Sequence, residues 1–355
     1  MRVPFIILFL IACPVILLAN SFAAKDIAYP ADVPFDKEVL VKIMKEKRAA
    51  HFLLGRSKQQ RNVEAWYFPG SSDKSALVIA GVHGSELSSV EVAKTLIGQL
   101  QQGWGNYYNV IVIPSLFPDN AVMAINNPMH IGSEANIGRY SMPYSVDPNR
   151  QMPSPGRAFD EQTGLDHLGR KIEIENQLLL QLIQSFRPQR IINIHAIRNT
   201  GYGGVYADPR TDDRGIALGY ASDSSLAIAM AEYIDEGGGN VNGNHLNKKP
   251  TALYYKDPLP APAGFFQKRN MTGSSLNANR GSGVSLGTWA STAVANEEDP
   301  SKSREAMRII TMEYPGCKRP VDYSSEAEQL LQQNQIELFA SSVYRIFLGN
   351  YFYRE

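Results

Sequence analysis

The chain has 355 residues, of which 44% are hydrophobic and 20% are charged, and its 35 basic residues balance its 35 acidic residues. This is the composition of an ordinary globular protein, long enough to bury a large core. No run of lysine or arginine is long enough to follow a phosphate backbone, so nucleic acid is not an expected partner. A net charge of zero would not hold the protein on an anionic membrane either.

The N-terminus reads as a secretory signal peptide over residues 1–23. A basic start precedes an apolar run, and the small residues Ser21 and Ala23 suit a cleavage site. We therefore expect an exported mature chain, 24–355, that is periplasmic in a Gram-negative source and keeps no stable membrane anchor. Two alternatives stay open: the apolar run is at the low limit for a permanent anchor, and Leu10–Cys13 resembles a lipoprotein cleavage box.

Cysteine use is sparse. Once the signal peptide is removed, Cys317 is the only cysteine left. The mature chain is therefore expected to form no internal disulfide and no thiolate zinc site.

Apolar periodicity predicts strands and helices that alternate along the chain. The expected elements are a helical stretch at 36–54, strands at 63–68, 76–82, 110–114, 190–194 and 308–312, and helices at 88–100, 172–186, 223–235 and 326–347. Residues 115–170 and 236–290 read as loops. Short apolar strands that alternate with amphipathic helices indicate an α/β fold with a mixed, largely parallel central sheet flanked by helices. We expect 24–355 to be a single catalytic domain.

Chemistry-bearing side chains follow the expected strands. His83 and Glu86 stand three residues apart at a strand-to-helix turn, where an imidazole and a carboxylate can bind one divalent metal. Alone this pair is weak, because the pattern is common by chance. His195 follows another buried strand, and Glu313 a third. Ligands of open α/β sheets collect at the carboxyl ends of strands, so the three segments are expected to meet.

The long loop after the strand at 110–114 carries Asp147, Asn149 and Arg150. Arginine can hold a carboxylate through two parallel hydrogen bonds, so Asn149 and Arg150 can fix a substrate carboxylate. Asp147 can accept the remaining ring N–H of a metal-bound histidine. The plain alternative is a turn with an exposed salt bridge.

Taken together, these motifs resemble the zinc carboxypeptidases of the carboxypeptidase A type, over roughly residues 60–345. The resemblance implies a phosphorylase/hydrolase-type sandwich and one Zn²⁺ per chain. It implies the following roles: His83, Glu86 and His195 bind zinc, Glu313 is the general base, Arg139 stabilises the oxyanion, and Asn149 and Arg150 hold the terminal carboxylate of a peptide substrate.

Within that family the chain looks closest to the bacterial murein peptide amidases. The shared forms are Asn149–Pro153, Ser285–Trp289 and Glu313–Pro315. The likeness implies a murein stem peptide as substrate, cut between γ-D-glutamate and diaminopimelate, with Ser285 in the specificity pocket. The mobile tyrosine of the digestive enzymes has no clear counterpart. Arg280 stands near its place and is expected to bind an extra acidic group, such as one carboxylate of diaminopimelate.

Two other functions fit part of the pattern. Deacylases of the aspartoacylase and succinylglutamate desuccinylase type share the metal-ligand motif, but they act on N-acyl amino acids in the cytoplasm, against which the signal peptide argues. A non-catalytic protein that binds wall peptides on the same fold would be expected to lack a ligand or the base, and none is missing here.

Overall fold

The structure is a computed structural model that describes residues 27–28, 37–103, 105–141, 146–219, 221–244, 246 and 283–350. The expected signal peptide, 1–23, the segment Leu10–Cys13 and Arg280 lie outside the described residues. The assignment of 24–355 to one catalytic domain stays a prediction. Among the described residues, no helix is both long enough and apolar enough to cross a bilayer.

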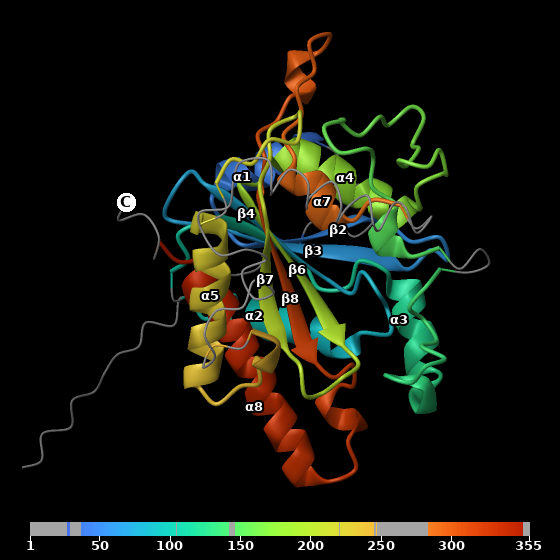
Figure 1. Cartoon of the computed structure of the whole chain (residues 1–355), viewed down its shortest axis with the longest axis vertical. Coiled ribbons are helices and arrows are strands. Elements are labelled where there is room, and N and C mark those ends of the chain that lie inside the picture. The colour runs from blue at the N-terminus through green and yellow to red at the C-terminus, as the bar shows by residue number, and fades with distance from the viewer. Residues whose placement is uncertain are drawn as a thin grey trace, which may run out of the picture.

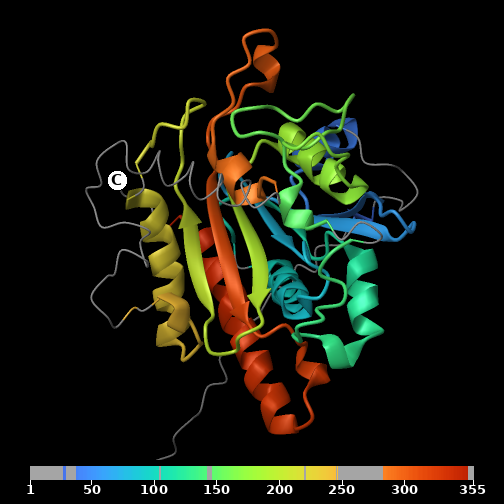
Figure 2. The same ribbon diagram turned by 45° about the vertical axis from the view of Figure 1, so that its right-hand side comes forward.

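A central sheet organises the described part of the chain, with eight strands in the order β1-β2-β3-β5-β4-β6-β8-β7. The strands are β1 (Ile27–Ala28), β2 (Ala50–Arg56), β3 (Asn62–Phe68), β4 (Ser75–Ala80), β5 (Asn109–Ile113), β6 (Arg190–Ile197), β7 (Gly204–Asp208) and β8 (Arg308–Pro315). In the middle β5, β4, β6 and β8 are parallel, whereas β2–β3, β3–β5 and β7–β8 pair antiparallel. Figure 2 shows β8 between β6 and β7. The prediction of a mixed, largely parallel sheet is confirmed.

Helices cover both faces of this sheet. They are α1 (Lys37–Glu46), α2 (Leu87–Gln101), α3 (Pro118–Ile125), α4 (Ile174–Phe186), α5 (Ala221–Glu236), α7 (Leu286–Ser291) and α8 (Glu326–Ser342). Short turns are η1 (Pro128–His130), η2 (Pro148–Arg150), η3 (Asn242–Asn244), η4 (Pro300–Lys302), η5 (Pro320–Asp322) and the π-helical η6 (Val343–Phe347). Figure 1 shows α1, α4 and α7 toward the top of the view and α5 and α8 toward its lower left.

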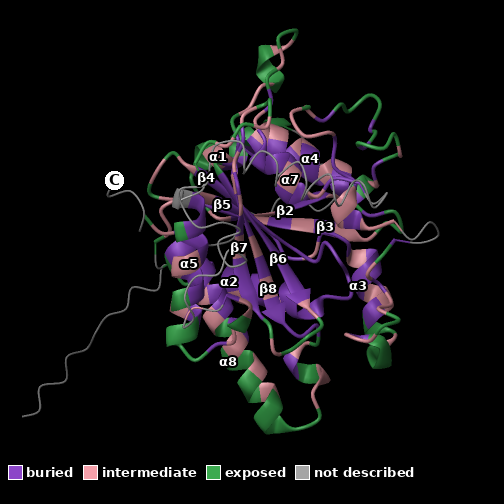
Figure 3. Cartoon of the chain, in the orientation of Figure 1, coloured by how far each residue is buried: buried purple, intermediate pink, exposed green. Residues whose placement is uncertain are grey.

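Each face has its own apolar cluster. Val78 of β4 packs on one side with residues of α2, α5 and α8, and its neighbour Leu77 packs on the other with residues of α1, α4 and α7. The continuous apolar run of β4 is explained by this burial on both faces, because successive strand residues point to opposite sides. Figure 3 shows the central strands mostly buried, β3 partly intermediate and the outer part of α8 exposed.

Polar residues replace the core toward the carboxyl ends of β6 and β8. Alternate residues along these strands share a face. The two rows are Ile191, Asn193 and His195 on β6 and Ile309, Thr311 and Glu313 on β8. The two isoleucines belong to the cluster under α4 and α7, and the other four line a pocket. On each of these two strands, the same row of side chains therefore begins in the apolar core and ends in the pocket.

Some elements differ from the expectations. The helical stretch predicted at 36–54 ends at Glu46, and β2 begins at Ala50. There His51 is paired with Trp66 of β3 and stacks on it with ring centroids 4.2 Å apart, a cross-strand contact that a local pattern does not reveal. Helices α3 and α7 and strand β7 lie in or beside segments without a predicted element. Strands β6 and β8 also run past their predicted ends, so His195 and Glu313 lie inside strands rather than after them.

Candidate active site

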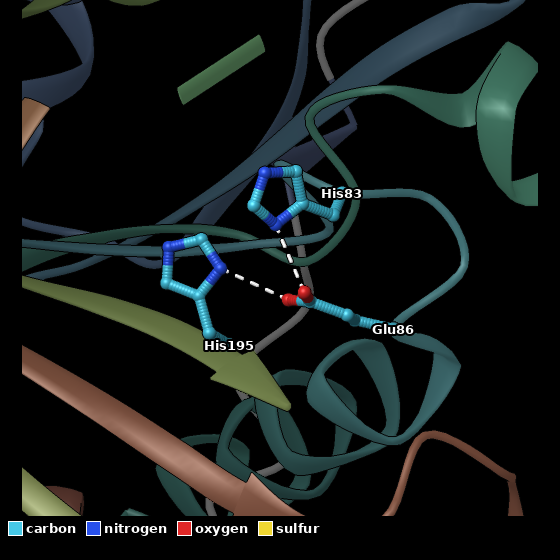
Figure 4. Close-up of side chains that lie close together, drawn as sticks. All are labelled: His83, Glu86 and His195. Atoms are coloured by element: carbon cyan, nitrogen blue, oxygen red, sulfur yellow. Dashed lines mark hydrogen bonds and ion pairs between the residues drawn. The ribbon is translucent and has the colours of Figure 1, made fainter. Parts of the chain in front are cut away.

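Two imidazoles point at one carboxylate in the interior of the protein (Figure 4). His83 Nδ1 lies 2.9 Å from Glu86 Oε1, and His195 Nδ1 lies 2.9 Å from Glu86 Oε2. The three side chains are buried, and one ligand atom from each lies within 4.8 Å of the others. The sequence prediction that these residues meet is confirmed.

The local fold explains how the pair at 83–86 reaches His195. The chain leaves β4, turns at His83 and enters α2, for which Glu86 is the N-terminal cap residue. The turn is tight against α3: a Cβ on Gly84 would lie 2.3 Å from the backbone of Asn120, so only glycine fits. Glu86 also accepts a hydrogen bond of 3.1 Å from the backbone N–H of Ala196, which ties the turn to β6.

A second layer of contacts orients the two rings. Asp147 Oδ1 lies 2.8 Å from His83 Nε2 and also accepts a hydrogen bond of 2.9 Å from the backbone N–H of Asn149. Asn149 Nδ2 lies 3.3 Å from Nε2 of His195. Such outer partners fix the tautomer and the direction of a ligand histidine. Asp147 and Asn149, from one loop, thus contact both imidazoles, and the role expected for Asp147 stays a prediction.

The charges of the group suit a cation. Although burial alone disfavours charge, the carboxylate of Glu86 raises the pKa of His83 to about 9, with Asp147 adding to this. Burial opposes ionisation of Glu86 too, but His83 and His195 hold the pKa of that carboxyl well below its usual range. Two inward-facing Nδ1 atoms around an ionised carboxylate form a set that one Zn²⁺, with bonds of about 2.0–2.2 Å, can bridge. The residues present therefore fit the expected metal.

Glu313 lies beside this group. It is the register partner of His195 on the neighbouring parallel strand, and it lines the same pocket. Burial raises the pKa of Glu313, His195 opposes the rise and the negative charge of Glu86 adds to it. A carboxylate with a raised pKa is suited to taking and returning a proton.

The pocket has a volume of about 620 Å³, and separate segments of the chain form different parts of its lining. One part is near α7, since the backbone N–H of Leu286 donates to Oδ1 of Asn149 over 3.2 Å, and Arg150 follows Asn149 in the lining. Ser285 lines this part, and its hydroxyl accepts from Thr288 N over 3.2 Å, so it caps α7. We call these residues the α7 end. The roles expected for Asn149, Arg150 and Ser285 stay predictions, as does that of Arg280.

Residues of segment 133–140 form another part of the lining, which we call the loop end. Arg139 lines it and donates from NH1 to Glu86 Oε1 over 2.7 Å. It is thus tied to the expected metal ligand Glu86. Its expected role in stabilising that oxyanion stays a prediction.

Sequence reasoning missed several polar pocket residues, among them Asn193, Thr311, Asp208 and Arg198. Asn193 and Thr311 stand two residues before His195 and Glu313, so strand alternation could have found them. Asp208 ends β7, which was not predicted, and reaches α7 because Gly287 has no side chain: a Cβ there would lie 2.5 Å from Asp208 Oδ2. Arg198 lines the loop end just past β6 and carried no motif.

Fold and site define an α/β protein that carries a buried His-Glu-His group, able to hold a metal, on the central strands of its sheet. Among solved structures, the chain is similar to a carboxypeptidase A from Helicoverpa armigera at 15% identity, over 86% of this chain and 71% of that one, with a TM-score of 0.46. A metallo-carboxypeptidase from Burkholderia cenocepacia has 13% identity, coverage of 88% and 70%, and a TM-score of 0.43.

A murein-tripeptide amidase from Escherichia coli O157 has 17% identity, coverage of 81% and 91%, and a TM-score of 0.39. No family model matches the sequence, and neither does any curated protein.

Proposed function

We propose that the protein is a zinc-dependent hydrolase that removes the C-terminal residue of a peptide, and that its substrate is a murein stem peptide. One observation carries the proposal: the ligand atoms of His83, Glu86 and His195 converge in the interior, and Glu313, the register partner of His195, lines the same pocket. Three protein ligands leave a position for water or substrate, which is the arrangement of catalytic rather than structural zinc sites.

The chain supplies a base and a cation at this point. A bound zinc ion provides Lewis-acid chemistry, polarising the scissile carbonyl and making the attacking water more acidic. Glu313 accepts the proton of that water and later delivers it to the leaving amine. Arg139 offers guanidinium donors to the developing oxyanion, which is where preorganised charge lowers a barrier most.

The α7 end suits the residue that leaves. Asn149 and Arg150 hold its terminal carboxylate, and the pocket behind them is polar rather than apolar. Asn193 is 2% exposed, and among the described residues its Oδ1 has no hydrogen-bond partner. Together with the carboxylate of Asp208, this oxygen offers acceptors to an ammonium group. Diaminopimelate carries such a group at the end of its side chain, which supports it as the leaving residue.

Export is the second half of the proposal. The expected signal peptide at 1–23 would deliver the mature chain to the compartment in which murein is exposed, the periplasm of a Gram-negative cell. Zinc bound once per chain and a free peptide substrate complete the proposed description, with no nucleic acid and no stable membrane anchor involved.

The test is hydrolysis of L-alanyl-γ-D-glutamyl-diaminopimelate by the zinc-loaded protein, with products identified by mass spectrometry. The proposal expects release of free diaminopimelate, loss of turnover in chelator and recovery on adding zinc. N-acetylaspartate and N-succinylglutamate are the parallel substrates: if they alone are cleaved, the protein is a deacylase. Zinc-containing protein that binds the tripeptide without cleaving it would instead be a binding protein.

A further inference from the structure

Three arginines line the pocket, and they lie at different places around the metal-ligand group. Arg150 belongs to the α7 end, Arg139 reaches Glu86 itself, and Arg198 belongs to the loop end. A peptide with one terminal carboxylate uses Arg150, and its oxyanion uses Arg139. The third cation, Arg198, has no counterpart in a substrate of that kind.

Arg198 is an exposed residue whose side chain makes one hydrogen bond to the loop end. It follows Ile197, the last residue of β6, and its NH1 donates to the carbonyl oxygen of Ser133 over 3.1 Å. The guanidinium thereby bridges from the strand that bears His195 to the segment that forms the loop end. Ser133 O is the partner that the structure gives it among the described residues, and four of the five N–H donors of an arginine remain for a ligand.

The distance suits a group near the scissile bond. Strands rise about 3.3 Å per residue, so the backbone of Arg198 lies about 10 Å along the chain from that of His195. Its side chain lines the same pocket. The leaving residue occupies the α7 end, so the residue that keeps the scissile carbonyl extends toward the loop end. Glu134 lines the same end and disfavours a second anion unless a cation offsets it.

We propose that Arg198 binds a second carboxylate of the substrate, on the acyl side of the scissile bond. This inference rests on the proposed peptidase function and deepens it. A residue linked through its γ-carboxyl group meets the requirement, because its α-carboxylate stays free a few bonds from the scissile carbonyl. Arg198 thereby selects γ-linked acidic residues over ordinary α-linked ones, and the loop end acts as a carboxylate subsite.

Two peptides that differ in one group provide the test. The first is L-alanyl-γ-D-glutamyl-diaminopimelate, and the second carries a carboxamide in place of the free α-carboxylate of its glutamyl residue. A charge-assisted hydrogen bond corresponds to about tenfold in binding. The zinc-loaded protein is expected to cleave the acidic peptide with a kcat/KM about tenfold higher than that of the amidated peptide.

Variants then assign this preference to the residue. Arg198→Gln should lower kcat/KM for the acidic peptide to that of the amidated one, and Arg198→Lys should restore part of the difference. Arg214→Gln is the matched control, since the Arg214 side chain is 75% exposed, pairs with Asp212 and does not line the pocket. It should keep the full preference.

The remaining outcomes contradict either the carboxylate subsite alone or the proposed function as well. Equal cleavage of both peptides by the unmodified protein, a preference that persists in Arg198→Gln, or an equal loss on both peptides in that variant overturns the carboxylate subsite and leaves the proposed function standing. If the zinc-loaded protein cleaves neither peptide, the proposed function falls and the inference falls with it.

Discussion

His195 and Glu313 are register partners on the adjacent parallel strands β6 and β8. His195 is an expected metal ligand and Glu313 is the expected base. Strand pairing, and not a loop, therefore sets the separation between them. Sites on paired strands are held more rigidly than sites on loops. The base is therefore in place before substrate or metal arrives.

Replacing that base provides the first prediction. Glu313→Gln keeps the shape of the side chain but cannot accept a proton, so kcat should fall by about 10²–10⁴. Zinc content should stay at one equivalent, because Glu313 is not among the three ligand residues. Glu305→Gln, at an exposed position, is the control and should keep full activity. Equal activity of both variants would remove Glu313 from the mechanism.

The pH dependence of metal binding follows from His83. In the metal-free protein its pKa is raised to about 9, chiefly through Glu86 opposing the effect of burial. Zinc needs a neutral imidazole, so binding must displace this proton. Affinity for zinc should therefore rise with pH up to about 9, with about one proton released per ion near pH 7. Calorimetry in buffers of different ionisation enthalpy measures that number, and no release would contradict the arrangement.

Asp147 provides a test of the outer contacts. Asp147→Asn removes the carboxylate that meets His83 Nε2 while preserving the size of the side chain. Zinc affinity should fall about 10–100-fold, the usual cost of losing such a partner. Asp160→Asn, in an exposed loop outside the pocket, should leave the affinity unchanged. Competition with a chromogenic chelator measures both, and unchanged binding by Asp147→Asn would count against the contact.

Arg150 is tested by pairing a variant with a modified substrate. If it holds the terminal carboxylate, Arg150→Ala and amidation of that carboxylate should each lower kcat/KM strongly. Applied together they should cost little more than either one alone, because both remove the same interaction. Losses that simply multiply would show that Arg150 contacts another part of the peptide.

Glu175 links stability to pH outside the pocket. It is 3% exposed, accepts from the backbone N–H of Lys58 over 3.2 Å, and burial raises its pKa to about 7. The folded protein thus retains a proton that the unfolded chain loses near pH 4.5, so this group contributes stability at low pH that is lost as pH rises to 7. The change is on the order of 3 kcal/mol.

Glu175→Gln should remove this contribution to the pH dependence of stability. Relative to the unmodified protein, the Tm of the variant should rise at pH 7.5 and not at pH 4.5. Glu337→Gln, on the exposed side of α8, should parallel the unmodified protein at both pH values. A pH-independent effect of Glu175→Gln would mean that the buried carboxyl does not titrate in this range.

The sequence predicts the central strands and the metal-ligand group well, and the physical reason is the same for both. Strand β4 is buried on both faces, so its apolar run is unbroken, and the turn after it places His83 and Glu86 together. The apolar run of β4 and the three-residue spacing of His83 and Glu86 are both local features of the sequence. Local features can be recognised without knowing the contacts between distant residues.

What the sequence did not predict depends on partners distant in the chain. Strand β7 is defined by its antiparallel pairing with β8, and Asp208 at its end reaches the pocket only through that pairing. Arg198 likewise becomes a pocket residue because segment 133–140 folds across from it. The apolar pattern of β6 ends at Ile194, but its pairing with β8 continues to Ile197. The sequence therefore places His195 after the strand, whereas the structure places it within the strand.

The most direct test of the metal site is an anomalous difference map at the zinc absorption edge, from crystals of the zinc-loaded protein. One peak per chain is expected, about 2.0–2.2 Å from Nδ1 of His83, Nδ1 of His195 and the carboxylate of Glu86. A map with no peak among these three side chains, or with its peak elsewhere on the chain, would contradict the proposed metal centre and the hydrolysis that depends on it.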